Sequence, residues 1–229
     1  MLLEGRSSKM TDFSFLYNRY LRNQRLVRGY KYQFSHPVGG WVEEPYFEAA
    51  ILHRGDLFLD IGANVGGWLI PASPYYRKVI GFEPSPEVAR VLENNLRLNK
   101  VRNAEIQQIA LGDIDGTRSL YLYPENGHDS FYPEHMMKKT TGKKVGVWTQ
   151  PLDSLNLAPS TIKIDTEGYE FPIILGGMKT LQKHLPGLCI ETHRLEDHNL
   201  IADTLPMYQW TRHRAADGQV SMIGKSFQV

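Results

Sequence analysis

The sequence is poor in several features that would assign it to a special class of protein. It has one cysteine, Cys189, in 229 residues, so no disulfide can form within the chain, which fits a reducing compartment. No apolar run approaches the ~20 residues that a membrane-spanning helix needs, and the N-terminus lacks the apolar segment of a secretory signal. The formal net charge is +1, which argues against a surface that coats nucleic acid. These absences predict a cytoplasmic protein with no membrane partner.

The remaining composition is that of an ordinary globular protein with an uneven N-terminus. Hydrophobic residues make up 41% and charged residues 22% of the chain, which is long enough for one sizeable core. Residues 1–32 carry seven Lys or Arg against two acids, and apolar residues recur at helical spacing between Asp12 and Gly29. We predict a basic N-terminal helical arm over residues 1–41 and a main domain over residues 42–229. We interpret the arm's charges as solvated, with RNA contact as the alternative.

A glycine loop between an apolar strand and a helix is the central motif. Residues 57–61 are typical of a buried strand, and Gly62 and Gly66 follow before an apolar helical segment. This order presents backbone N–H groups to a ligand, and Asp60 lies at the strand end where open α/β sheets bind ligands. The spacing Gly-x-x-x-Gly has fewer glycines than the dinucleotide fingerprint, which favours a nucleoside without a pyrophosphate. A plain turn is the alternative.

A second acid strengthens the nucleoside interpretation. Glu83 ends the second apolar run, 23 residues after Asp60. An acid about 20 residues beyond the glycine loop is placed to accept hydrogen bonds from ribose hydroxyls. Residues 103–111 are predicted to form the third strand. In a sheet of order 3-2-1, the end of this strand brings Ala110 and Leu111 to the base of a nucleoside that Asp60 and Glu83 hold. A simple turn is the alternative.

Strands and helices alternate through most of the chain, which is typical of a parallel sheet with helices on both faces. We predict helices over residues 65–73, 85–99 and 171–185, and strands over residues 78–82, 117–123, 145–150, 160–165 and 188–192. The C-terminus is predicted to form a hairpin around Asp217 and Gly218. Residues 124–144 are long, polar and irregular, and segments of this kind are often functional.

Three motifs together resemble those of a known family. They are Asp60-Ile61-Gly62-Ala63-Asn64-Val65-Gly66, Phe82-Glu83-Pro84 and Ile164-Asp165-Thr166-Glu167-Gly168-Tyr169-Glu170. In this order they resemble the signature motifs of FkbM-type S-adenosylmethionine-dependent methyltransferases, with weaker signals at Ala110-Leu111-Gly112 and Ile190-Glu191-Thr192-His193. The resemblance covers residues 42–194. It implies the class I methyltransferase fold, a Rossmann-like sheet of seven mostly parallel strands with helices on both faces and an antiparallel C-terminal hairpin.

The resemblance also implies a cofactor and an acceptor. The cofactor is S-adenosyl-L-methionine, and the acceptor is a hydroxyl of a small molecule or sugar. The residues expected to bind the cofactor are Glu44, Asp60, Gly62, Asn64, Gly66, Glu83, Pro84, Ala110 and Leu111. Glu44 belongs to a stretch that packs over the cofactor in the family. A surface acid at the start of a helix is the alternative for this residue.

Methyl transfer to oxygen requires a base that accepts the hydroxyl proton. Asp165 and Glu167 alternate on one side of the fourth parallel strand as it leaves the sheet, so both are predicted at the ligand edge. One is expected to be the base and the other to orient the acceptor or the cofactor's amino group. His193 leaves the next strand in the same way and is a further candidate for base or acceptor binding. In the structural alternative, Asp165 holds the loop, Glu167 caps a helix, and His193 has no catalytic part.

Carboxylate clusters also bind divalent cations, and Asp165, Glu167 and Glu191 form one such group. Nothing in their spacing demands an ion, so the sequence predicts no metal ligands. A divalent cation stays open as an additional cofactor. Two other functions remain open. One is an RNA ribose or cap methyltransferase, indicated by the basic N-terminus and the lysines of residues 124–144. The other is a non-catalytic nucleoside-binding module. The sequence does not indicate the acceptor's identity or the oligomeric state.

Overall fold

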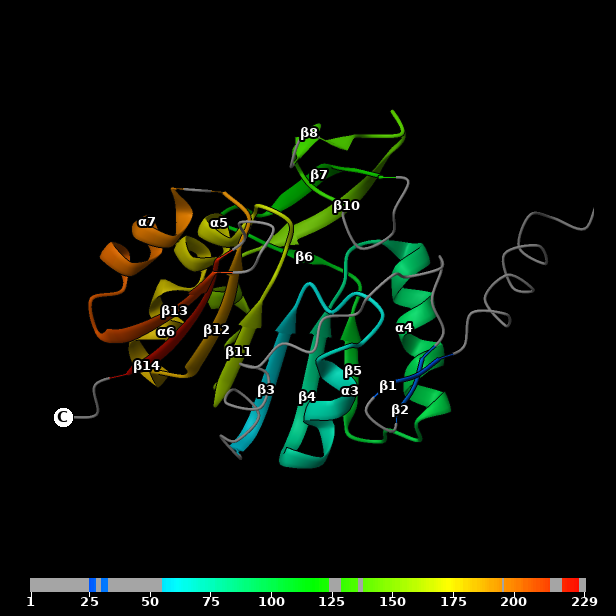
Figure 1. Cartoon of the computed structure of the whole chain (residues 1–229), viewed down its shortest axis with the longest axis horizontal. Helices are drawn as coiled ribbons and strands as arrows, with labels where there is room; N and C mark the ends of the chain where they lie inside the picture. Colours follow the sequence, from blue (N-terminus) through cyan, green and yellow to red (C-terminus); the bar gives the residue numbers. More distant parts are fainter. Residues whose placement is uncertain are drawn as a thin grey trace, which may run out of the picture.

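A seven-stranded, mostly parallel sheet forms the centre of this computed structural model (Figure 1). The structure describes residues 25–27, 30–32, 55–123, 129–135, 138–194, 196–214 and 220–226. The strand order is β13-β14-β12-β11-β3-β4-β5. The parallel strands are β3 (Gly55–Ile61), β4 (Tyr76–Phe82), β5 (Ala104–Gln107), β11 (Thr161–Ile164) and β12 (Gly187–Thr192). At one edge, β13 (Tyr208–Arg214) and β14 (Val220–Ser226) form an antiparallel hairpin. The predicted α/β class and terminal hairpin are confirmed.

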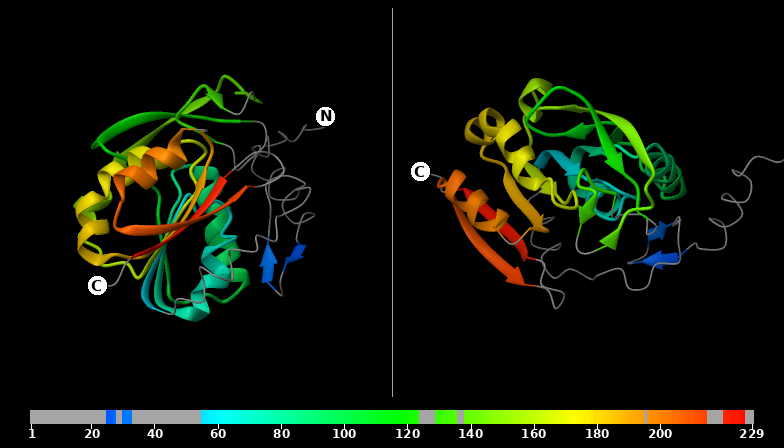
Figure 2. Two further views of the ribbon diagram at one scale, coloured as in Figure 1. Left: turned by 60° about the vertical axis from the view of Figure 1, so that its left-hand side comes forward. Right: turned by 90° about the horizontal axis from the view of Figure 1, so that it is seen from above.

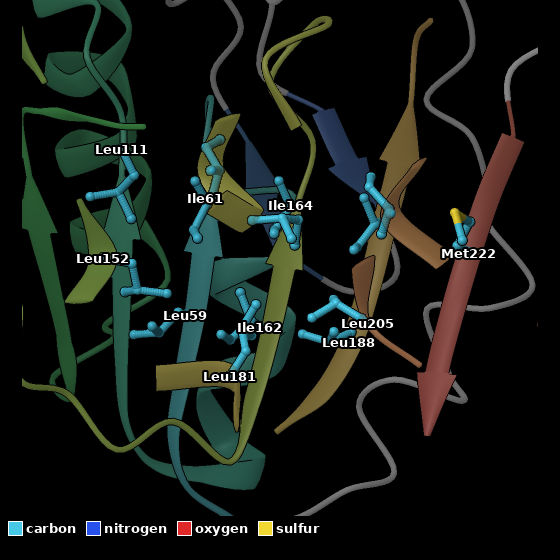
Figure 3. Packing of buried hydrophobic residues seen from close by; sticks show 14 of the residues in the cluster. Leu59, Ile61, Leu111, Leu152, Ile162, Ile164, Leu181, Leu188, Leu205 and Met222 are labelled. Atoms are coloured by element: carbon cyan, nitrogen blue, oxygen red, sulfur yellow. The ribbon is translucent and has the colours of Figure 1, made fainter. Parts of the chain in front are cut away.

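Helices cover both faces of this sheet, which explains why most side chains of its inner strands are buried. One face packs against α3 (Leu69–Ala72), the 3₁₀ turn η1 (Ser73–Tyr75) and α4 (Pro86–Leu98). The other face packs against α5 (Glu170–Gly176), α6 (Met178–His184) and α7 (Asp197–Thr204). Figure 3 shows this second interface, where Leu59, Ile61, Ile162 and Ile164 meet Leu181 and Leu205. All four residues of β11 are buried.

A smaller sheet lies over the carboxyl ends of the parallel strands (Figures 1 and 2). It has the order β6-β10-β7 and consists of β6 (Ala110–Leu111), β10 (Lys144–Gln150) and β7 (Gly116–Tyr121). The predicted single strand over residues 103–111 is therefore wrong, because it splits into β5 and β6. Strand β5 pairs with β4 only as far as Gln107, and Ala110 then pairs with Thr149 of β10. The hairpin of β8 (Glu134–His135) and β9 (Lys138–Lys139) adjoins this sheet.

Other local predictions also require correction. The helix predicted over residues 171–185 is interrupted at Gly177 between α5 and α6. The helix predicted over residues 65–73 begins only at Leu69, because the glycine loop extends through Gly66. Helix α7 was not predicted. The helix predicted through Gly29 is wrong at its end, where β1 (Arg25–Val27) and β2 (Tyr30–Tyr32) pair antiparallel. The 41/42 domain boundary and Glu44 lie outside the described residues.

Within the described ranges, no helix combines the length and apolar character required to span a bilayer. Cys189 is buried in β12, as expected of a small core residue.

Candidate active site

A cavity opens at the carboxyl ends of β3, β4 and β11, beneath the smaller sheet. Eight of the predicted site residues line it, namely Gly62, Asn64, Glu83, Pro84, Ala110, Leu111, Asp165 and Glu167. Much of the remaining wall is apolar or aromatic and comprises Ile61, Phe82, Val88, Ile109, Leu120, Phe131, Tyr169 and Ile173. Asp60, Gly66 and His193 are not among the lining residues. The cavity therefore combines a mostly apolar wall with a few convergent polar groups, as small-molecule sites usually do.

The glycine loop forms the floor of the cavity through backbone geometry that its sequence permits. Gly62 has a φ of +78°, and its N–H and that of Ala63 both donate to the Phe82 carbonyl at 3.0 Å. A Cβ at Gly62 would lie 1.8 Å from the Asp165 carbonyl oxygen, so only glycine fits there. Gly66, with a φ of +94°, instead allows close packing against Leu92. The second glycine thus serves helix packing in this structure.

Glu83 presents a fixed carboxylate to the cavity. One oxygen accepts from the Asn64 N–H and the other from the Ser85 N–H, both at 2.9 Å. Burial raises the pKa of Glu83 to about 7, although these two donors partly offset the effect. Each carboxylate oxygen can accept more than one hydrogen bond. Glu83 is therefore oriented by the loop and retains acceptor capacity for a ligand.

Asp60 lies beneath the loop, where it pairs with a buried lysine. It is 0% exposed, and its Oδ1 is 3.3 Å from Lys163 Nζ. The same ammonium donates to the Gly62 carbonyl at 3.0 Å and lies 3.3 Å from Asp165 Oδ2. Burial raises the pKa of Asp60, and Lys163 offsets only part of this shift. Burial alone would lower the pKa of Lys163, but the carboxylates of Asp165, Asp60 and Glu191 outweigh it and raise this pKa.

Lys163 was not among the predicted site residues, although the sequence contained a signal for it. A lysine within the apolar run Thr-Ile-Lys-Ile of a strand buried on both faces requires a partner, because lysine is almost never fully buried unpaired. The lysine connects the glycine loop to Asp165, so the cofactor loop and the candidate base have one shared support.

Replacing Lys163 with Met is expected to lower the free energy of unfolding by about 3 kcal/mol, because Asp60 would keep a buried, uncompensated charge. Urea denaturation monitored by circular dichroism measures the change. The control is Lys183→Met on the exposed side of α6, where a change within about 0.5 kcal/mol is expected. A loss below about 1 kcal/mol in Lys163→Met would show that Asp60 does not need the ammonium.

His193 lies among four carboxylates from two strand ends and the start of α5. Its Nδ1 is 3.1 Å from Glu170 Oε1. Its Nε2 is 3.7 Å from both Asp165 Oδ1 and Glu167 Oε2, and 3.9 Å from Glu191 Oε1. The structure therefore brings together the three predicted catalytic residues, although they leave different strands. The His193 side chain is 1% exposed, so it lies behind the two lining carboxylates.

Hydrogen bonds from the β11–α5 loop fix the partner of His193. Glu170 Oε1 accepts from the N–H groups of Thr166 and Gly168, both at 3.0 Å, as well as from the imidazole. Burial would raise the pKa of Glu170, but His193 and these donors outweigh it and lower this pKa. Burial would likewise lower the pKa of His193, but Glu170 and the other carboxylates raise it to about 10. The backbone of Glu167 adopts the left-handed conformation, with a φ of +55°.

An aromatic wall contributes contacts that the sequence did not indicate. Phe131 and Tyr169 both line the cavity, with ring centroids 4.6 Å apart. The guanidinium carbon of Arg118 on β7 lies 5.0 Å from the Tyr169 ring centroid, and this arginine also donates to the Tyr169 hydroxyl. The Tyr169 O–H in turn donates to Asp113 at 3.3 Å. Phe131 lies in the irregular segment 124–144, where no periodicity marks it as a cavity residue.

The chain is similar to known methyltransferases in sequence and in fold. The sequence profile described as "Methyltransferase FkbM domain" matches residues 60–215. A solved methyltransferase FkbM from Methylobacillus flagellatus KT superposes with a TM-score of 0.55 at 20% identity, covering 74% of this chain and 44% of that one. An rRNA methylase from Streptococcus thermophilus superposes with a TM-score of 0.53 at 9% identity, covering 82% of this chain and 100% of that one. At these identities the structural likenesses show the fold.

A curated protein of Danio rerio, a tRNA (guanine(37)-N(1))-methyltransferase, is 39% identical over 67 residues. The match covers 29% of this chain and 13% of that protein, so the chain spans only a small part of this relative.

Proposed function

Because the chain belongs to the FkbM methyltransferase family, we propose that it transfers a methyl group from S-adenosyl-L-methionine to a hydroxyl oxygen of a small molecule or sugar. The observation that carries the proposal is a single cavity at the carboxyl ends of the parallel strands. There the glycine loop and the Glu83 carboxylate face the same space as Asp165 and Glu167. This arrangement supplies a nucleoside site next to two carboxylates that can serve an acceptor.

The lining residues fit this cofactor. Glu83 offers oriented carboxylate oxygens of the kind that accept hydrogen bonds from ribose hydroxyls. Ile109, Ala110 and Leu111 give an apolar surface next to it, which suits an adenine ring. When bound, the cofactor supplies a methyl group already activated by the positive sulfonium, so the protein's main task is to position the reactants. Asp60 supports this site from beneath the loop through Lys163.

Asp165 is the base in this proposal. It lines the cavity with a side chain that is 29% exposed, while Lys163 holds one of its oxygens from behind. Glu167, also in the lining, orients the acceptor hydroxyl toward Asp165. His193 is almost fully buried and acts as a positioning residue, because its Nε2 lies 3.7 Å from an oxygen of each carboxylate. As the hydroxyl oxygen attacks the methyl group, its proton passes to the Asp165 carboxylate.

Isothermal titration with S-adenosylhomocysteine tests the cofactor half of the proposal. We expect saturable heat with one site per chain. The absence of heat at high micromolar protein and ligand would contradict it. The acceptor half is tested by mass spectrometry of acceptor panels incubated with labelled cofactor, and an added mass of one methylene unit on a hydroxyl compound is the expected result.

Binding of S-adenosylhomocysteine is expected to weaken about tenfold between pH 8 and pH 6, because protonation removes the Glu83 acceptor. With a pKa of about 7, roughly nine-tenths of this carboxyl is protonated at pH 6. The folded-state pKa is raised, so the contribution of Glu83 to fold stability is complete below its unfolded pKa and is lost as pH rises through 7. Unfolding through this group therefore cannot explain weaker binding at pH 6.

The matched control for this pH dependence is Glu83→Gln, which keeps the side-chain shape and removes the titration. Titration calorimetry should give weaker binding that no longer changes between pH 6 and pH 8. A wild-type dissociation constant that is flat over this range would show that the Glu83 carboxylate does not contact the ligand.

Ribose or cap methylation of RNA is the second candidate. The 67-residue match to a tRNA methyltransferase favours RNA as the substrate class, although that protein's name specifies a base nitrogen and not a ribose hydroxyl. The basic residues of the N-terminal segment also favour RNA. Carboxylates at the cavity argue against phosphate contacts there, so RNA binding would depend on basic residues elsewhere. Affinity for a short RNA should then fall steeply with salt, since each phosphate contact releases counterions. Weak binding without this salt dependence would remove the candidate.

A further inference from the structure

The side chains of Asp165, Glu167 and His193 lie close enough together to hold one metal ion after small adjustments. One oxygen of each carboxylate and one ring nitrogen lie within 4.8 Å of one another. The ring nitrogen Nε2 is 3.7 Å from both carboxylate oxygens. That separation is too long for a direct hydrogen bond. It is the separation of two ligands that each lie ~2.1 Å from a shared ion, which places them roughly 3–4 Å apart.

The imidazole is oriented as metal-binding histidines usually are. Such a histidine commonly donates its other ring N–H to a carboxylate, which fixes the tautomer and directs the remaining nitrogen at the ion. His193 Nδ1 lies 3.1 Å from Glu170 Oε1, and Glu170 is 0% exposed and anchored by the Thr166 and Gly168 N–H groups. This support directs Nε2 toward the carboxylates that line the cavity.

The carboxylates of this group are accessible to a cation from the cavity. Five carboxylates are joined through the contacts of two cationic side chains: Asp60, Asp165, Glu167, Glu170 and Glu191. Asp165 and Glu167 have their exposed edges in the cavity, so a divalent ion can reach them from solvent.

We propose that Asp165, Glu167 and His193 bind one divalent first-row transition ion of the Mn²⁺ type, with Glu170 orienting the histidine and Glu191 beside it. Two carboxylates suit Mn²⁺, and one imidazole disfavours Mg²⁺ and Ca²⁺, which prefer ligands that are all oxygen. This ligand set replaces the all-carboxylate group suggested by the sequence. Because Asp165 and Glu167 line the cavity, the bound ion would be accessible from it.

The role of the ion rests on the proposed function. An ion bound to two residues that line the cavity would be within reach of the acceptor hydroxyl, which it would bind and whose pKa it would lower. The hydroxyl proton would still pass to the Asp165 carboxylate, and the acceptor oxygen would form its bond to the methyl group as the bond from methyl to sulfur breaks. An acceptor with two adjacent hydroxyls, as in a sugar or a catechol, would fill two open positions. The ion therefore favours that class of acceptor.

Mn²⁺ binding to the full chain tests the proposal without cofactor or acceptor. The protein is stripped with EDTA, and free Mn²⁺ is followed by the intensity of its electron paramagnetic resonance signal. We expect one Mn²⁺ per chain in the wild type. Binding should be at least tenfold weaker in Glu167→Gln and in His193→Gln, since even supporting residues typically contribute that much to metal affinity. His184→Gln, at the end of α6, is the control and should bind as the wild type does.

Circular dichroism establishes that each variant is folded. Glu167→Gln preserves the size of a partly exposed side chain, so it remains informative if His193→Gln fails to fold. A wild type that leaves all Mn²⁺ free at concentrations where S-adenosylhomocysteine binds would overturn the proposal. So would a folded Glu167→Gln that binds Mn²⁺ as tightly as the wild type. Because the assay contains no acceptor, the ion site and methyl transfer can fail independently of each other.

Discussion

Replacement of Asp165 with Asn is expected to lower kcat by about 10²–10⁴, the usual contribution of a general base. The amide keeps the size of the side chain but does not accept the hydroxyl proton. Asp165 contacts Lys163 and lies near His193 at the cavity, whereas the groups assigned to the nucleoside, Glu83 and the glycine loop, are untouched. Binding of S-adenosylhomocysteine should therefore change little while turnover is lost.

Single-turnover methyl transfer and titration calorimetry on the same preparation separate these two effects. Asp203→Asn, on the exposed side of α7, is the matched control and should keep wild-type turnover. Wild-type turnover in Asp165→Asn would exclude this carboxylate as the base. Normal cofactor binding combined with lost turnover would also exclude a module that only binds nucleosides, because such a protein has no turnover to lose.

The second large effect is expected from Gly62→Ala. The alanine Cβ would lie 1.8 Å from the Asp165 carbonyl oxygen, in a backbone conformation with a φ of +78° that already disfavours L side chains. The carbonyl belongs to the loop that carries Asp165 and Glu167, so accommodating the methyl group would separate the cofactor loop from the candidate catalytic loop. We expect a loss of more than about 4 kcal/mol in the free energy of unfolding, or failure to fold, which is exceptional for one methyl group.

Gly142→Ala separates the two causes of this effect. Gly142 has the same φ of +78°, and a Cβ there would meet nothing within 4 Å. Its substitution should therefore show only the backbone cost, about 1–2 kcal/mol. Thermal and urea denaturation of the two variants measure the difference. Equal losses would mean that the close approach of the two loops contributes nothing to stability.

The sequence placed Asp60 correctly at a strand end, but the Asp60 side chain does not line the cavity. Its position at the end of the first parallel strand was predicted from local sequence, and the strand is present as β3. The side chain is absent from the cavity lining because the neighbouring β11 places Lys163 directly opposite Asp60 in the register. Register between strands about 100 residues apart is a property of the folded sheet, and no local pattern around Asp60 encodes it.

The sequence by itself determined the alternating strands and helices, the glycine loop, and the two acids at the ends of β3 and β4. These depend on hydrophobic period, on turns that require glycine, and on chain distance, all of which are local. Only the tertiary structure decided which residues meet: the split of β5 from β6, the burial of Asp60 on Lys163, the aromatic wall, and the meeting of His193 with Asp165 and Glu167. Such contacts arise from pairing and packing between segments that are distant in the sequence. Their contribution to the free energy of folding depends on partners that cannot be identified from a short stretch of sequence.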